Sequence, residues 1–239
     1  MPREDIEDDD LLHPEIRQAL RALRHAINIQ TSVKTIHRFQ ESIQNPSLPM
    51  LDRHVRDLIS ILDQRGDDLR EESLQAMNKA QQAFHQLSAR NRRKVRAYYR
   101  DDLRTYLDIQ NFDGPLEIFG EQFQDTQGAL FRAVDLRRKL LHLRRVRLTV
   151  PCHMRSMQHP VIDRLMQDNQ REAMSLEHDQ IVGERLLNVR FQGLSEDEQN
   201  LFWLWYESDM KACGFQKITG TRYFRFTAMR PTIVVTEHE

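Results

Sequence analysis

Residues 14–44 read PEIRQALRALRHAINIQTSVKTIHRFQESIQ, and this stretch decides the fold class. Its apolar side chains recur every three or four residues, with one shift of phase, which is the spacing of one buried face of a helix. Pro14 suits the first turn of a helix, and Asn45-Pro46 ends it. The stretch predicts one long amphipathic helix. Its apolar positions are Ile16, Leu20, Leu23, Ile27, Ile29, Val33, Ile36 and Ile43.

Further helical patterns follow on the C-terminal side of this stretch. Residues 51–66 have the same periodicity and close near Gly66, and residues 67–87 and 88–109 each repeat it. Residues 115–144 are also helical in pattern, although two glycines interrupt them. Short connections between amphipathic helices favour antiparallel neighbours, so the sequence predicts a helical bundle.

The periodicity changes after residue 144. Residues 145–150, RVRLTV, alternate with period two and stop at a proline, which favours a strand. Helical patterns return at residues 160–187 and at 195–212, where Ser195 and Glu198 form a capping box. We expect a mostly α fold (α+β) with a small antiparallel sheet near the C-terminus. The expected strands are residues 145–150, 188–191, 215–218, 222–227 and 232–236.

This pattern divides the chain into three parts. Residues 1–12 are expected to be an acidic disordered tail, residues 13–144 the helical bundle, and residues 145–239 an α+β region with a C-terminal hairpin. We also consider that the acidic tail masks a basic surface of the folded chain. That hypothesis predicts tighter anion binding when the tail is deleted.

Composition excludes several classes of protein. The 239 residues contain only 8 Gly and 8 Pro, which argues against a turn-rich all-β fold. The two cysteines imply no disulfide framework. The first ten residues lack the apolar core of a secretory signal. The longest apolar run, Leu201–Tyr206, is too short to cross a bilayer. We therefore expect a cytoplasmic protein, or a virion-internal one if the source is viral, without a membrane partner. No metal and no other cofactor is expected.

Positive charge gathers in the middle of the chain although the net charge is −1. Residues 90–147 hold 14 Lys or Arg against 8 Asp or Glu. On a helical wheel the arginines between Arg90 and Arg104 form one arc, opposite an apolar and aromatic arc. Such a ridge is either a solvated helix face or a contact for nucleic-acid phosphates. The candidate phosphate contacts are Arg90, Arg93, Arg96, Arg100, Arg104, Arg137, Arg138 and Arg144.

An aromatic block near the C-terminus is the candidate protein interface. The run LFWLWY covers every face of its helix and contains both tryptophans of the chain. A helix that is apolar all round is buried or meets a partner. We take Trp203, Trp205 and Tyr206 as candidate contacts for a protein partner or for self-association.

Catalytic and metal motifs give little support to an enzyme. Arg-x4–6-His, the spacing found in helical ribonucleases of the HEPN class, occurs at Arg137/His142, Arg147/His153 and Arg171/His178, which is about as often as chance predicts. Cys152, His153 and His159 lie close in sequence, but no second paired ligand motif follows. No catalytic residue is therefore assigned.

The sequence favours a non-enzymatic helical adaptor or structural protein that acts through protein–protein contacts, with an arginine ridge that contacts nucleic-acid phosphates. Two alternatives stay open. The first is a dedicated RNA- or DNA-binding protein, and the second is a helical Arg/His ribonuclease.

Overall fold

A computed structural model describes residues 12–43, 53–109, 119–156, 158–217 and 224–226 of the chain. These residues are mostly helical, as the sequence predicts. The helices are α1 (Pro14–Ile43), α2 (Arg53–Gln86), α3 (Ala89–Leu107), α4 (Glu121–Thr149), α5 (Cys152–Arg155), α6 (Pro160–Gln192) and α7 (Glu196–Ala212).

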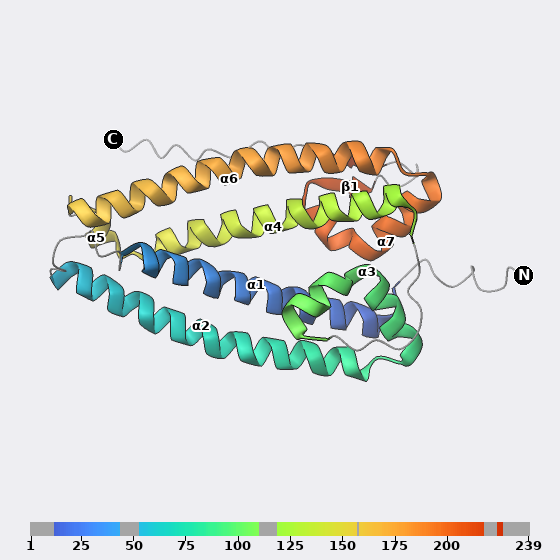
Figure 1. Cartoon of the computed structure of the whole chain (residues 1–239), viewed down its shortest axis with the longest axis horizontal. Coiled ribbons are helices and arrows are strands. Elements are labelled where there is room, and N and C mark those ends of the chain that lie inside the picture. The colour runs from blue at the N-terminus through green and yellow to red at the C-terminus, as the bar shows by residue number, and fades with distance from the viewer. Residues whose placement is uncertain (1–11, 44–52, 110–118, 157, 218–223, 227–239) are drawn as a thin grey trace, which may run out of the picture.

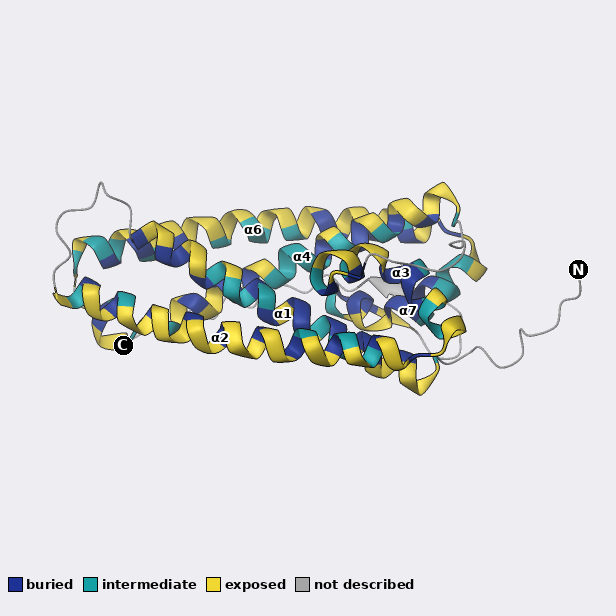
Figure 2. Cartoon of the chain, turned by 60° about the horizontal axis from the view of Figure 1, so that its bottom comes forward, coloured by how far each residue is buried: buried dark blue, intermediate teal, exposed yellow. Residues whose placement is uncertain are grey.

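Four long helices lie side by side in the order α2, α1, α4, α6, and the shorter α3 and α7 pack at one end of them (Figure 1). α1 and α4 run in the same direction, and α2 and α6 return antiparallel to them. The outward faces are exposed and the inward faces buried, as Figure 2 shows. The predicted helix over residues 14–44 is therefore present, and its apolar stripe lies in the core.

One predicted helix boundary is wrong. The sequence pattern ends a helix near Gly66 and begins another at residue 67, but α2 continues through this position. Gly66 is buried, and a Cβ built on it would lie 3.6 Å from Nε2 of Gln40 and 3.8 Å from Ile36. A single glycine costs a helix only about 1 kcal/mol, which the packing of α2 on α1 outweighs.

Two predicted strands are wrong. Residues 145–149 belong to the end of α4, which Val150 follows as the C-cap residue, and residues 188–191 belong to the end of α6. Val146 and Val150, four residues apart, are 3% and 0% exposed, whereas Leu148 between them is 69% exposed. The apolar alternation at the end of α4 therefore follows one helical face, an ambiguity that short apolar runs always carry.

The C-terminal part holds two strands of three residues, β1 (Phe215–Lys217) and β2 (Phe224–Phe226), which pair antiparallel. Beyond this pair, the small antiparallel sheet expected near the C-terminus is not shown in the described residues, and the predicted strand 232–236 lies outside them. The expected boundary between residues 144 and 145 falls within α4, and one hydrophobic core joins residues from both sides of it. Most of the expected acidic tail also lies outside the described residues.

Candidate functional site

α3 begins at a capping residue and buries one side. Oγ of Ser88 accepts a hydrogen bond from the backbone N–H of Asn91 at 3.2 Å, which satisfies a free N–H of the first turn. The helix packs on α1 and α2. Its opposite side is therefore left to solvent. The buried residues of α3 are Val95, Arg96, Tyr98, Tyr99, Leu103 and Leu107.

Four arginines occupy the solvent side of α3. All four are exposed, and none forms an ion pair with any residue that the structure describes. Two of them, three residues apart, precede the kink of α3 at Tyr99, and two, four residues apart, follow it, so each pair lies near one side of its own half of the helix. We call these side chains the α3 arginine face. They are Arg90, Arg93, Arg100 and Arg104.

Arg96 does not belong to this face, contrary to the sequence prediction. Its residue is 7% exposed and lies on the buried side of α3. A guanidinium in that position is out of reach of a phosphate backbone, so Arg96 is removed from the candidate contacts. The aromatic side chains of α3 follow the expected arrangement, because Tyr98 and Tyr99 are 3% and 1% exposed and lie in the core.

Two kinked helices hold α3 in place through reciprocal hydrogen bonds. α3 departs from helical geometry at Tyr99 and α7 does so at Tyr206. The Tyr99 hydroxyl donates to the carbonyl of Trp205 at 2.9 Å, and the Tyr206 hydroxyl donates to the carbonyl of Tyr98 at 2.9 Å. Each tyrosine hydroxyl thus donates to the carbonyl of the residue immediately before the kink in the other helix. The rings of Tyr98 and Trp205 stack with centroids 3.9 Å apart.

A buried ion pair adds α1 to this junction. Arg24 donates to both carboxylate oxygens of Asp209 at 2.9–3.2 Å and to the Tyr99 hydroxyl at 2.7 Å. Asp209 is 7% exposed, so its charge depends on this guanidinium. α1, α3 and α7 are therefore joined by one polar network.

A cavity of about 150 Å³ lies beside this network. Asp102 of α3 and Arg138 of α4 line it together with Tyr106. Burial raises the pKa of Asp102 to about 6, against the opposing attraction of Arg138. Arg138 was expected to contact phosphate, but it lines this cavity and is only partly exposed. It is not part of the α3 arginine face.

The other two arginines predicted on α4 pair with carboxylates of α6. Arg137 lies 3.6 Å from Oε1 of Glu184, which is 7% exposed, and Arg144 forms an ion pair and hydrogen bond with Glu177. These pairs tie α4 to α6. These two predicted phosphate contacts are therefore paired within the chain, although Arg144 stays exposed.

The candidate protein interface is buried. Trp203, Trp205 and Tyr206 are 5%, 4% and 0% exposed and belong to the hydrophobic core. α7 turns toward α3 and α4 and is enclosed by their aromatic rings. These three residues therefore cannot bind a partner without opening the fold, and the interface prediction is wrong for them.

The histidine of the Arg137/His142 motif is also buried. His142 is 4% exposed, and its Nδ1 lies 2.8 Å from Oγ of Ser32 on α1. Burial, with nearby Arg145 and Arg138, lowers the pKa of His142 to about 4. The ring is thus neutral at pH 7, and Arg137 of the same motif forms an ion pair with Glu184 of α6.

The cluster of Cys152, His153 and His159 does not form a metal site. Across the described part of the chain, no group of three or more His, Cys, Asp or Glu side chains is arranged to hold a metal ion. Nη2 of Arg155 instead donates to Sγ of Cys152 at 2.8 Å.

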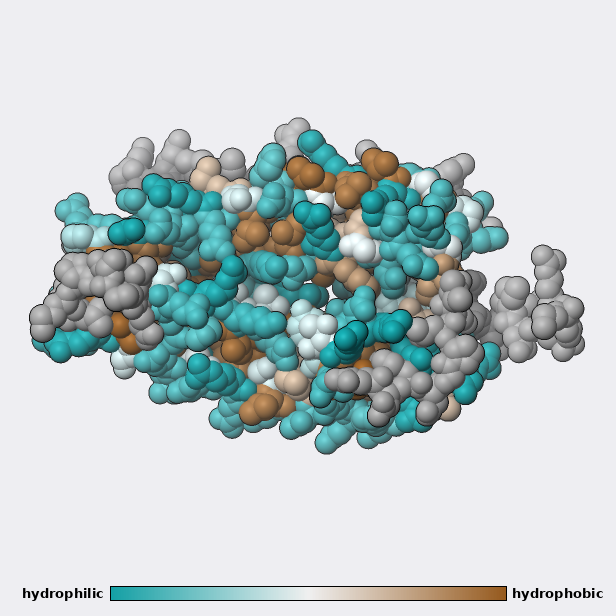
Figure 3. Space-filling model, in the orientation of Figure 1, coloured by the Kyte–Doolittle hydropathy of each residue, from teal (hydrophilic) through white to brown (hydrophobic). Residues whose placement is uncertain are grey.

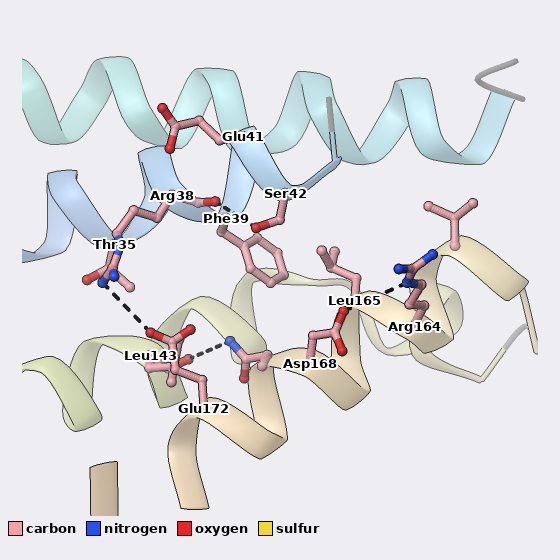
Figure 4. A pocket seen from close by; sticks show the side chains of 12 residues that line it. Thr35, Arg38, Phe39, Glu41, Ser42, Leu143, Arg164, Leu165, Asp168 and Glu172 are labelled. Atoms are coloured by element: carbon pink, nitrogen blue, oxygen red, sulfur yellow. Dashed lines mark hydrogen bonds and ion pairs between the residues drawn. The ribbon is translucent and has the colours of Figure 1, made fainter. Parts of the chain in front are cut away.

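A larger cavity of about 530 Å³ lies between the end of α1 and the start of α6, far from α3 (Figure 4). Its rim carries both signs of charge in two long, exposed ion pairs, Arg38–Glu172 at 3.7 Å and Arg164–Asp168 at 3.9 Å. Asn169 is 5% exposed at its floor and donates to the carbonyl of Leu143 at 3.5 Å. The alternating charges of this rim select no class of ligand.

The chain was compared with protein-family models, with curated proteins and with solved structures, and none of these comparisons gives a match. Within the described ranges, no helix has both the length and the apolar character needed to cross a membrane. The functional argument therefore rests on the geometry of the α3 arginine face.

Proposed function

We propose that this protein is a non-enzymatic helical adaptor or structural protein whose α3 arginine face binds the phosphates of RNA or DNA. One observation carries the proposal: four neighbouring arginines are exposed and have no carboxylate partner among the described residues. Arginine binds phosphate oxygens in a two-point geometry, and clustered cations gain affinity by releasing counterions from the nucleic acid.

The setting of the face favours binding without base recognition. The tyrosines of α3 are buried, so they offer no platform on which bases could stack. The face stands on a helix braced by α1 and α7, so little ordering entropy is lost on binding. We expect affinity for nucleic acid of any sequence.

The remaining predictions from the sequence have different outcomes. Protein contact through the aromatic block is not proposed again, because that block is buried. The ribonuclease alternative has no favouring observation in the site. A cytoplasmic or virion-internal location and a small antiparallel sheet near the C-terminus stay predictions.

The test compares two variants that lose the same charge. The first replaces the four residues of the α3 arginine face by alanine, and the second replaces four exposed arginines of α1 and α2. Binding of a fluorescent 20-nucleotide RNA and of a duplex DNA is followed by anisotropy at low salt. We expect at least about tenfold weaker binding for the first variant only. The control substitutions are at Arg17, Arg21, Arg56 and Arg65.

Equal losses in both variants would show that binding follows total charge rather than α3, and would contradict the proposal. So would the absence of binding by the wild-type protein at low salt. Circular dichroism of both variants establishes that they are folded, which is expected because all eight positions are exposed.

A further inference from the structure

α3 and α7 cover one side of α4 near its N-terminal end. Phe123 and Leu130 lie on this side, about two helical turns apart, and are 1% and 0% exposed. The ring of Phe123 contacts those of Tyr98 in α3 and Phe202 in α7, with centroids 6.4 and 5.1 Å apart. The first half of this apolar side of α4 is therefore buried against the two shorter helices.

The same side of α4 continues as an exposed apolar surface. Leu141 and Leu148 follow Leu130 after about three and about five full helical turns, so all three lie on one side of the helix. Leu141 and Leu148 are nevertheless 46% and 69% exposed. The apolar side of α4 thus runs from a covered N-terminal half into a C-terminal half that faces solvent.

Two exposed apolar residues of α6 lie level with these leucines. The two ion pairs between α4 and α6 are seven residues apart on both helices and set an antiparallel register. This register places Leu141 level with Ile181 and Leu148 level with Met174, each to within one residue. Ile181 and Met174 are 40% and 63% exposed.

The four apolar side chains surround one ion pair. The leucines of α4 are three residues before and four after Arg144, and the apolar residues of α6 have the same offsets from Glu177. Residues at these offsets share one side of a helix, so all four lie on the side of the ion pair. Apolar side chains are visible over α4 and α6 in Figure 3. We call this surface the α4–α6 apolar patch. It consists of Leu141, Leu148, Met174 and Ile181.

The rim of the patch is cationic. Arg145 and Arg185 each follow a residue of the patch by four positions, are exposed and form no ion pair with any described residue. Residues 136–149 of α4 contain no Asp or Glu. Glu177 and Glu184 of α6 are already paired with arginines of α4. An occupant of the patch therefore has to supply the carboxylates.

The spacing of the patch fits a helix as its occupant. Its two apolar layers are seven residues apart, a rise of about 10.5 Å, which equals the distance between residues i and i+7 of another helix. A second copy of the chain fits poorly, because its patch would bring the same arginines against those of the first. The exposed Asp179 does not offset them, since it lies about 160° around α6 from Ile181.

We infer that the α4–α6 apolar patch binds an amphipathic helix of a partner protein, with apolar side chains every seven residues and Asp or Glu on both flanks. The apolar side chains of that helix pack on the patch, and its carboxylates pair with Arg145 and Arg185. The inference goes beyond phosphate binding by α3 and does not rest on it.

Two helical peptides that differ only in their flanking charge test the inference. Each is about three heptads long and has Leu at the two apolar positions of every heptad, with Glu on both flanks in one peptide and Lys in the other. Binding of each fluorescent peptide to the full chain is followed by anisotropy. We expect the Glu-flanked peptide to bind at least about tenfold more tightly, because its carboxylates meet unpaired arginines.

Paired substitutions locate the binding site. Leu141→Asp with Leu148→Asp is expected to weaken binding of the Glu-flanked peptide at least about tenfold. Ile61→Asp with Leu74→Asp adds the same charge at exposed apolar positions of α2 and is the matched control, which is expected to keep wild-type affinity. Circular dichroism establishes that both variants are folded.

Two arginine variants separate the rim of the patch from α3. Arg145→Ala with Arg185→Ala is expected to remove the preference for the Glu-flanked peptide. The variant that lacks the α3 arginine face is expected to bind this peptide as the wild type does. Loss of peptide binding in that variant would overturn the inference, because the acidic peptide would then be bound by α3.

Further outcomes would also overturn the inference. They include no binding of the Glu-flanked peptide by the wild type, and equal losses in the two aspartate variants. A wild-type dimer in sedimentation velocity that dissociates when Leu141 and Leu148 are replaced would assign the patch to a second copy. Binding of phosphatidylserine vesicles that the same substitutions abolish would assign it to an anionic lipid surface.

Discussion

Arg93 and Arg96 lie less than one turn apart in α3, yet the first is exposed and the second is 7% exposed. The helical wheel placed both on the charged arc. It could not separate them, because α3 bends at Tyr99 and its packing on α1 and α2 covers the edge of that arc. Sequence predicts which residues are cationic, but burial in the fold decides which cations meet solvent.

Asp102 offers a direct test of the cavity beneath α3. Its folded-state pKa is raised to about 6 from 3.8, so its contribution to stability is present below pH 3.8 and is lost as pH rises through 6. We expect Asp102→Asn to raise the free energy of unfolding by about 1–3 kcal/mol at pH 8 and by little at pH 4. Urea denaturation at both pH values measures this. A destabilised variant at pH 8 would mean that the carboxylate is favourably paired.

His142 has the opposite dependence on pH. Its pKa is lowered from 6.5 to about 4, so its contribution is present above pH 6.5 and is lost as pH falls toward 4. Between pH 7 and pH 4.5 we expect the free energy of unfolding of His142→Leu to fall by about 1–3 kcal/mol less than that of the wild type. Identical pH profiles of the two proteins in urea denaturation would place this histidine in solvent.

At the scale of elements, the long helices were predictable, whereas two of the expected strands proved to be helix ends. Long amphipathic periodicity predicted α1 and α6 because many positions repeat the pattern. Residues 145–150 offered only six positions, and their alternation fits a strand and a buried helix end equally well. Continuation of α4 was decided by contacts with a helix distant in sequence.

Gly66 tests the continuity of α2. A Cβ there meets its nearest atom at 3.6 Å, an ordinary contact, and the glycine lies within a helix. We expect Gly66→Ala to stabilise the protein by about 0.5–1 kcal/mol in chemical denaturation. A loss of stability would contradict the continuous helix and favour the break that the sequence pattern suggests.

The junction of α3 with α7 depends on two hydroxyls. Tyr99→Phe and Tyr206→Phe each remove a donor and leave a buried carbonyl with fewer partners. Each variant should lose about 1–3 kcal/mol of unfolding free energy. Tyr106→Phe is the matched control, because its hydroxyl has no hydrogen bond with the described residues and its loss is expected to cost less. Similar values for all three would argue against the reciprocal bonds.

At the scale of the whole molecule, the local excess of cations was visible in the sequence. Which of these cations are exposed and which are paired within the chain was not. Arg137 and Arg144 are paired across α4 and α6, and Arg138 lines a cavity. These contacts join residues about 33–47 positions apart in the chain, which no local pattern reveals. Of the eight predicted contacts, the four of the α3 arginine face are exposed without an ion pair to any described residue, and Arg144 is exposed but paired.

The dependence of binding on salt tests this account most directly. Four phosphate contacts predict that the logarithm of the association constant falls against the logarithm of salt concentration with a slope of about −3 for single-stranded RNA and about −4 for duplex DNA. The anisotropy titration is repeated from 50 to 200 mM salt, as an order-of-magnitude range in which such slopes are resolved. Slopes near these values that approach zero in the α3 variant are the predicted result. A slope near zero in the wild type, or one unchanged by the variant, would contradict phosphate binding by α3.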